Sequence, residues 1–276
     1  MSKYFNIIFL LLLWLPFSAG ARSYYEYVDS ADTYINSGEW KKAENSILNA
    51  LKLEPSNYNN SLLLSNLATI QRMQGRYSEA VNNYTVALNI TPNAVTLLNN
   101  RGVLYLEIDS IAKAKSDFVR AMELDEKDIQ SKYYCSLILI NEGKFDDAKS
   151  LIKKIREIEP NTIEAVDATA KVSQAEKNYH EAIRNYNHLI NIERKIEWII
   201  NRAECFLATK SYAQASEDIA EAIEADPENG YVYLLKALLK KNQFESEESL
   251  KNIELAVKYG IDRDYAEYFV KNGINL

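Results

Sequence analysis

Apolar and small residues recur along the chain with a helical spacing that restarts at a regular interval. The clearest copy is the stretch from Ser61 to Ala94, with Ala68, Gly75 and Pro92 among its marker residues. Similar stretches recur at a period of about 34 residues, which is typical of stacked helix pairs. The pattern therefore predicts paired helices along most of the chain.

Seven such pairs are predicted. They cover about 24–57, 61–94, 95–128, 129–162, 163–195, 196–229 and 230–263. Residues 264–276 are predicted to form a further helix that caps the array, because the last unit of a repeat array must present one side to water. No Pro/Gly/Ser-rich linker interrupts the pattern, so we expect one continuous array over 24–263.

Each recurring residue type has a physical reason. Ala68 and Ala80 let the two helices of a pair approach closely. Gly75 can adopt the left-handed backbone conformation that ends a first helix, and Pro92 interrupts the second helix because proline lacks the N–H that a helix interior needs. Asp109 takes the glycine position in the third pair, so its turn is less sharply specified.

This set of residues resembles the tetratricopeptide repeat (TPR) family. The resemblance implies an all-α fold, a right-handed superhelical solenoid of about seven TPR helix pairs with a C-terminal capping helix. It also implies that the first helices line a concave surface, along which a peptide commonly lies, and that the second helices face outward.

Residues 1–21 have the pattern of a secretory signal peptide. Lys3 precedes an apolar run, and Ala19 and Ala21 form a cleavage site of the A-x-A type. The run is shorter than the roughly 20 apolar residues of a membrane span, although a retained anchor or a buried first helix is the alternative. We expect an exported protein, periplasmic or extracellular, with a bacterial host favoured and no stable membrane span after cleavage.

Charge and motif content narrow the function classes. The formal net charge is −7, with Lys and Arg spread along the chain, whereas a nucleic-acid partner needs a basic face. His180 and His188 do not have the spacing of a helical zinc pair, and Cys135 and Cys205 fall two repeats apart, too far for a disulfide. We expect no nucleic-acid partner, no metal and no cofactor.

Candidate catalytic groups are few. No P-loop, dinucleotide-binding, zinc-protease or nucleophile-elbow pattern occurs in the sequence. The acidic cluster Glu217, Asp218, Glu221 and Glu224 falls on a second helix, where a solvated face is expected. The sequence therefore predicts that the protein is not an enzyme.

The candidate binding residues fall on the first helices. The resemblance places Asn66, Asn100 and Asn201 where the family often presents an asparagine inward, and such an amide either bonds a peptide unit of a ligand or bonds the next repeat. A strip of apolar residues follows on the third and fourth pairs, and exposed apolar strips often mark partner sites. Its members are Val103, Leu106, Tyr133, Leu137 and Ile140. If the register is off by one residue, this strip belongs to the packed core instead.

The function predicted is that of a non-catalytic scaffold or adaptor that binds a peptide or protein segment on the concave TPR surface. The predicted partner-binding residues are Asn66, Asn100, Val103, Leu106, Tyr133, Leu137 and Ile140. The alternative is a structural or assembly subunit of a cell-envelope complex, which would use the convex faces and the cap. An enzyme is the third and least favoured class.

Overall fold

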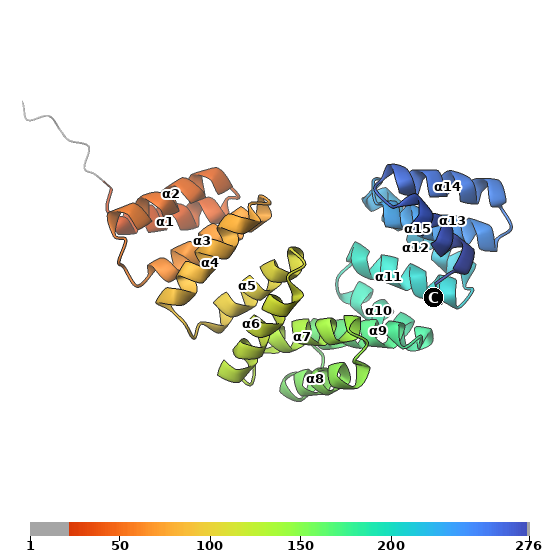
Figure 1. Ribbon diagram of the computed structural model, residues 1–276, viewed down its shortest axis with the longest axis horizontal. Helices are drawn as coiled ribbons and strands as arrows, with labels where there is room; N and C mark the ends of the chain where they lie inside the picture. Colours follow the sequence, from red (N-terminus) through yellow and green to blue (C-terminus); the bar gives the residue numbers. More distant parts are fainter. Residues whose placement is uncertain (1–21, 275–276) are drawn as a thin grey trace, which may run out of the picture. The chain divides into compact units, whose positions relative to one another are not determined.

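The structure is a computed structural model that describes residues 22–274 of the chain. Within that range the chain forms fifteen α-helices and no strand (Figure 1), so the predicted all-α repeat fold is confirmed. The predicted signal peptide, residues 1–21, lies outside the described residues, as do residues 275 and 276 of the predicted cap. None of the helices within 22–274 combines the length and the apolar character that a membrane crossing requires.

The first fourteen helices form seven pairs, and one helix follows the last pair. The pairs are α1 (Tyr24–Asn36) with α2 (Trp40–Leu53), α3 (Asn60–Met73) with α4 (Tyr77–Ile90), α5 (Val95–Glu107) with α6 (Ile111–Leu124), α7 (Ile129–Asn141) with α8 (Phe145–Ile158), α9 (Ile163–Ala175) with α10 (Tyr179–Ile192), α11 (Ile196–Ala208) with α12 (Tyr212–Ala225), and α13 (Gly230–Asn242) with α14 (Ser246–Lys258). The helix after them is α15 (Arg263–Asn272).

The turn inside each pair places one residue in the left-handed backbone conformation. Glycine fills this position at Gly38, Gly75 and Gly143, as the sequence predicted, with φ near +72°. The other pairs use Asp109, Lys177, Lys210 and Phe244, at φ between 54° and 64°. An L-residue in this conformation costs about 1–2 kcal/mol, so the packing of the helix pair sets the turn even without glycine.

Small residues and ion pairs hold the two helices of a pair together. Ala68 and Ala80 have no exposed surface. The Arg202 guanidinium donates two hydrogen bonds, of 2.9 and 2.7 Å, to the carboxylate of Asp218. Asp218 was expected on a solvated acidic face, and that expectation is wrong because its side chain is buried against the first helix of its own pair.

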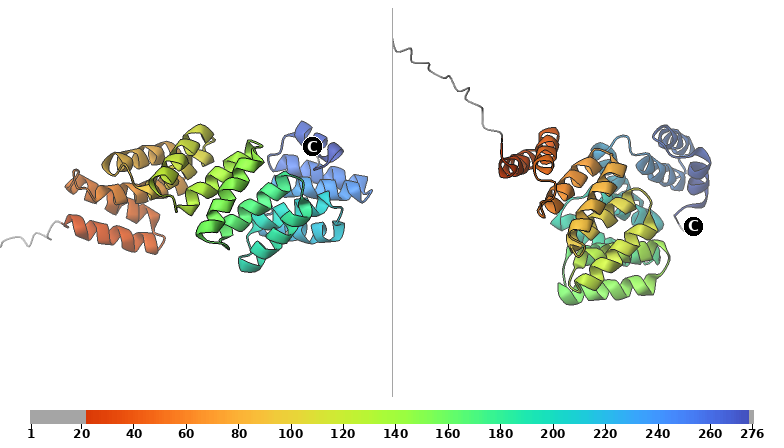
Figure 2. Two further views of the ribbon diagram at one scale, coloured as in Figure 1. Left: turned by 90° about the horizontal axis from the view of Figure 1, so that it is seen from below. Right: turned by 60° about the vertical axis from the view of Figure 1, so that its left-hand side comes forward.

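The chain divides into two compact units, one up to Pro92 and one from Asn93 onward. The first contains α1–α4 around a core that includes Ile47 and Leu67. The second contains α5–α15, and there each second helix packs against the first helix of the following pair (Figure 2). The sequence predicted one continuous array and carries no linker at residue 92.

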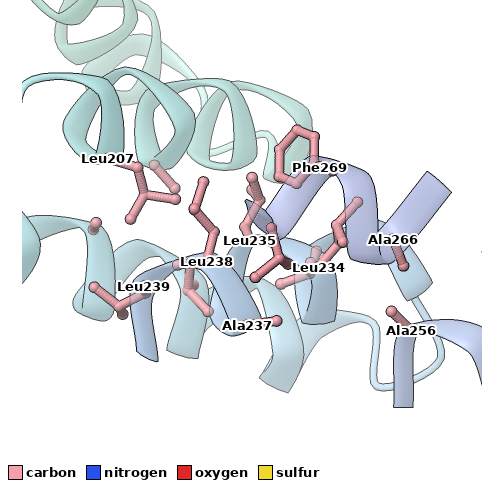
Figure 3. Close-up of a cluster of buried hydrophobic side chains, with 14 of the residues drawn as sticks. Leu207, Leu234, Leu235, Ala237, Leu238, Leu239, Ala256, Ala266 and Phe269 are labelled. Carbon is pink, nitrogen blue, oxygen red and sulfur yellow. The ribbon is translucent and has the colours of Figure 1, made fainter. Parts of the chain in front are cut away.

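Helix α15 ends the second unit by covering α13. Ala266, Phe269 and Val270 of α15 are buried with Leu234 and Leu238 of α13 in one apolar cluster (Figure 3). Because α15 is amphipathic, it buries this face and leaves its other face in water. The predicted capping helix is thus present, and it packs on α13 and α14.

Candidate functional site

A cavity of about 500 Å³ in the second unit is lined mainly by three first helices, α7, α9 and α11. The α7 side is formed by the apolar side chains of Leu137 and Ile140, with the amide of Asn141 at the end of the helix. The other two helices supply ammonium, amide and carboxylate groups. These residues are Lys171 and Gln174 from α9 and Glu197, Asn201 and Glu204 from α11. Ala175, Lys177, Tyr179, Tyr186 and Ile274 complete the lining.

The repeat explains why these side chains face the same space. Leu137 and Ile140 are the ninth and twelfth residues of α7, and Lys171 and Gln174 hold the same positions in α9. Glu204 is the ninth residue of α11. Residues that share a position in stacked, equivalent helices point in the same direction. The cavity therefore changes from apolar to polar within one repeat.

Asp167 is the centre of a buried hydrogen-bond network at the cavity. Its side chain is 3% exposed. The carboxylate accepts hydrogen bonds from the Tyr133 hydroxyl at 2.6 Å and from the Trp198 indole nitrogen at 2.7 Å. It also pairs with the Lys171 ammonium at 2.9 Å. Since a buried carboxylate is stable only when it is bonded, these contacts tie α7, α9 and α11 together.

Lys171 is held between two carboxylates. Its ammonium lies 2.9 Å from Asp167 and 2.9 Å from Glu197. Burial lowers the pKa of the ammonium, but the carboxylates of Asp167 and Glu197 raise it by more, so the net shift is upward. Glu197 is 65% exposed, so Lys171 has one buried partner and one partner at the cavity rim.

Glu204 is a carboxyl group whose hydrogen bonds offset the effect of burial on its pKa only in part. Burial raises the pKa of Glu204, although hydrogen bonds with Tyr231 and Gln174 lower it in part. The Tyr231 hydroxyl donates to its Oε2 at 3.0 Å, and the Tyr186 hydroxyl donates to the Oε1 of Gln174 at 2.7 Å. The polar wall thus contains both a charged pair and a carboxyl group that binds a proton more readily than an exposed glutamate.

Three of the seven predicted binding residues lie at or beside the cavity. Leu137 and Ile140 line it. Tyr133 bonds Asp167 and, like Ile140, packs against the buried residues Ile152 and Val172. On α7 the predicted strip therefore lies partly at the cavity and partly against buried residues, and its role in partner binding stays a prediction.

The other four predicted residues are not brought to this cavity. Asn100, Val103 and Leu106 are half-buried on α5. Asn66 is half-buried on α3 in the first unit. Their role in binding stays a prediction. Asn201, which the resemblance also singled out, does line the cavity.

The polar wall was not predicted from the sequence. Two of its members, Lys171 and Gln174, hold the positions in α9 that Leu137 and Ile140 hold in α7. Asp167, which pairs with Lys171 beside the wall, holds the position of Tyr133. These polar residues do not belong to an apolar strip, so the hydrophobic pattern does not mark them. The signal that does mark them is the recurrence of each helix position in successive first helices.

Other reactive groups are placed without a visible site. His180 and His188 are exposed on α10, and among residues 22–274 no three His, Cys, Asp or Glu side chains form a group suited to a metal ion. Cys135 and Cys205 are buried free thiols. Burial raises the pKa of Cys135 to about 11 and that of Cys205 further, so both thiols are protonated at neutral pH.

Comparison with known families supports the repeat assignment. Tetratricopeptide repeat models match residues 70–109 and 95–128. The crystal structure of a tetratricopeptide repeat protein from Parabacteroides merdae ATCC 43184 is 28% identical, with a TM-score of 0.73, over 91% of this chain and 98% of that chain. The Cut9–Hcn1 hetero-tetramer of the APC/C gives a TM-score of 0.71 over 90% of this chain and 55% of that chain, at 11% identity, which shows the fold alone.

Similarity to characterised sequences is more partial. The BBSome complex member BBS4 of Bos taurus is 25% identical over 231 residues, which is 82% of this chain and 43% of that protein. The photosystem I assembly protein Ycf3 of Synechococcus sp. (strain CC9605) is 31% identical over 38% of this chain and 60% of that protein. The chain thus spans less than two thirds of the length of either relative. It carries tetratricopeptide repeats, which typically mediate protein–protein interactions.

Proposed function

We propose that the protein is a non-catalytic scaffold that binds an extended segment of another protein in the cavity of its second unit. The observation that carries this proposal is the division of the cavity into an apolar wall on α7 and a polar wall on α9 and α11. A peptide presents the same two kinds of group, apolar side chains and backbone N–H and C=O groups. The cavity is thus suited both to the apolar side chains and to the backbone groups of a peptide.

The polar wall offers donors and acceptors at defined places. An ammonium has three N–H donors, and Asp167 and Glu197 account for two of those of Lys171. The remaining donor suits a backbone carbonyl. The Asn201 amide supplies a donor and an acceptor in the same wall. Because Asp167 and its partners fix α7, α9 and α11 in advance, binding costs little ordering of the receptor.

The location is a second part of the proposal. The signal-like pattern of residues 1–21 supports export to the periplasm or the extracellular space. N-terminal sequencing of the protein from its own host tests this. Arg22 as the first residue supports export, whereas a chain that retains residues 1–21 in the cytoplasm contradicts it.

Affinity capture with two matched variants tests the binding site. Leu137→Asp places a carboxylate on the apolar wall, and Leu250→Asp makes the same change on α14, where the side chain is 63% exposed. We expect Leu137→Asp to reduce capture of the partner at least tenfold and Leu250→Asp to leave it unchanged. Circular dichroism shows whether both variants keep their helices. Equal capture by a folded Leu137→Asp protein would contradict the site.

A further inference from the structure

One lining residue of the cavity comes from the far end of the chain. Ile274 is half-buried and lies two residues beyond the end of α15, yet it lines the same cavity as Leu137 and Ile140 of α7. It also packs at the edge of the apolar cluster between α13 and α15. An aliphatic side chain from the chain's own tail therefore contributes to the lining of the proposed binding cavity.

The position of Gly273 and Ile274 is determined by α15. Phe269 and Val270 are buried against α13. The Lys241 ammonium on α13 donates hydrogen bonds of 2.7 Å to each of the backbone carbonyls of Val270 and Lys271. These contacts fix the carboxyl end of α15 and thereby the starting point of Gly273 and Ile274.

Gly273 then redirects the chain. Its φ of +82° and ψ of −174° lie in a region that is open essentially to glycine alone. The next residue is Ile274, whose side chain lies between the cavity and a smaller hollow of about 170 Å³ next to Leu207 and Leu238. Phe269, Val270 and Lys241 hold α15 in place. A different residue, Ile274, reaches the cavity.

We propose that Ile274 is an internal substitute for a ligand side chain. The cavity takes an extended peptide that carries a branched aliphatic residue, and this residue occupies the place of Ile274 in the cavity that Leu137 and Ile140 also line. Ile274 must leave before the peptide binds, so the tail lowers the apparent affinity by competition. This inference rests on the proposed function, because it names the ligand class and the regulation of the same cavity.

The chain offers its own probe for this competition. The probe is an acetylated and amidated hexapeptide with the sequence of residues 271–276, Lys-Asn-Gly-Ile-Asn-Leu. It is titrated into the full chain and into the Ile274→Gly variant, and binding is followed by the methyl NMR signals of Leu and Ile residues. We expect the peptide to bind Ile274→Gly about tenfold more tightly than the unaltered chain and to shift the signals of Leu137 and Ile140.

Two controls define the specificity. A peptide with aspartate in place of its isoleucine is expected not to bind the Ile274→Gly variant. Adding Leu137→Asp to Ile274→Gly is expected to abolish binding of the original peptide. Amide signals of α15 report whether the helix remains docked, since its anchoring residues are unchanged in every variant.

The outcomes separate this inference from the function on which it rests. Equal affinity for the unaltered chain and Ile274→Gly, with shifts at Leu137, would overturn the internal substitute while supporting the cavity as a peptide site. No binding to either chain would also overturn it, and partner capture would then decide the function independently. Binding that survives Leu137→Asp would contradict both.

Discussion

The inner faces of α9 and α13 hold the same place in their repeats but have opposite character. The fifth and ninth residues of α13 are Leu234 and Leu238, which are buried beneath α15 (Figure 3). The same positions in α9 are Asp167 and Lys171, which form a polar network beside a cavity. Where a helix of the chain covers the inner face, that face is apolar. Where the inner face of α9 lines the cavity, it offers polar groups that suit a peptide backbone, whereas the α7 side of the same cavity carries Leu137 and Ile140.

Helix α15 also demonstrates what the inner face can accommodate. It places Phe269 on the leucines of α13, and its carboxyl end is bonded by Lys241. An apolar anchor and a donor to a backbone carbonyl are the two kinds of contact that we propose for a partner segment at α7 and α9. The contacts of α15 on α13 can therefore be compared directly with those proposed for a partner segment in the cavity.

The largest effect is expected at the covered face. Phe269→Ala removes a buried ring from the α13–α15 cluster, and such a truncation costs about 3–5 kcal/mol. We expect a loss of about 3 kcal/mol in the free energy of opening α13–α15, measured by amide hydrogen exchange. Tyr268→Ala is the control, since that side chain is 56% exposed. Similar losses for both variants would show that α15 is not anchored through Phe269.

A smaller effect is expected at the polar network. Asp167→Asn keeps the shape of the side chain but removes the charge that accepts from Tyr133, Trp198 and Lys171. Hydrogen bonds to charged groups contribute about 1.5–3 kcal/mol each, so denaturant unfolding should show a loss of about 2 kcal/mol.

The control for this variant is the other partner of Lys171. Glu197→Gln changes a rim carboxylate that is 65% exposed, where ion pairs contribute about 0–1 kcal/mol. We expect a clearly smaller loss for Glu197→Gln than for Asp167→Asn. Equal losses would mean that the buried end of the network does not hold α9 and α11 together.

The smallest effect is a pH dependence at Glu204. Burial raises the pKa of Glu204 in the folded protein above its unfolded value of about 4.3. The stability from the protonated carboxyl is therefore fully present below the unfolded pKa and is lost as the pH rises through the folded pKa. Relative to Glu204→Gln, the unaltered chain should lose stability as the pH rises from below about 4.3 through the raised folded pKa of Glu204. A difference between the two chains that does not vary with pH would contradict the shift.

Much of the fold could be predicted because the repeat period fixes where each helix begins. Alanines such as Ala68 and glycines such as Gly75 mark the helix contacts and the turns by their size and backbone freedom. Phe244 shows the limit of such markers, since it adopts the same left-handed turn without being glycine. Tertiary packing determines that turn, and residue preference does not reveal it.

The site could be predicted only in part. Leu137 and Ile140 were found because an apolar strip is visible in the sequence, whereas Lys171 and Glu204 look like ordinary surface charges there. Their burial depends on the next repeat, which brings Glu197 to Lys171 and Tyr231 to Glu204. The approach of Ile274 depends on the packing of α15, and no short-range pattern contains that information.

Photo-crosslinking tests the central claim most directly. A photoreactive phenylalanine analogue is placed at position 137 in one protein and at position 250 in another, and each is irradiated in cells of the protein's own host. We predict that position 137 crosslinks a segment of another protein and that position 250, on α14, gives no crosslink to the same protein. Crosslinks to that partner from position 250 and none from position 137 would contradict binding in the cavity.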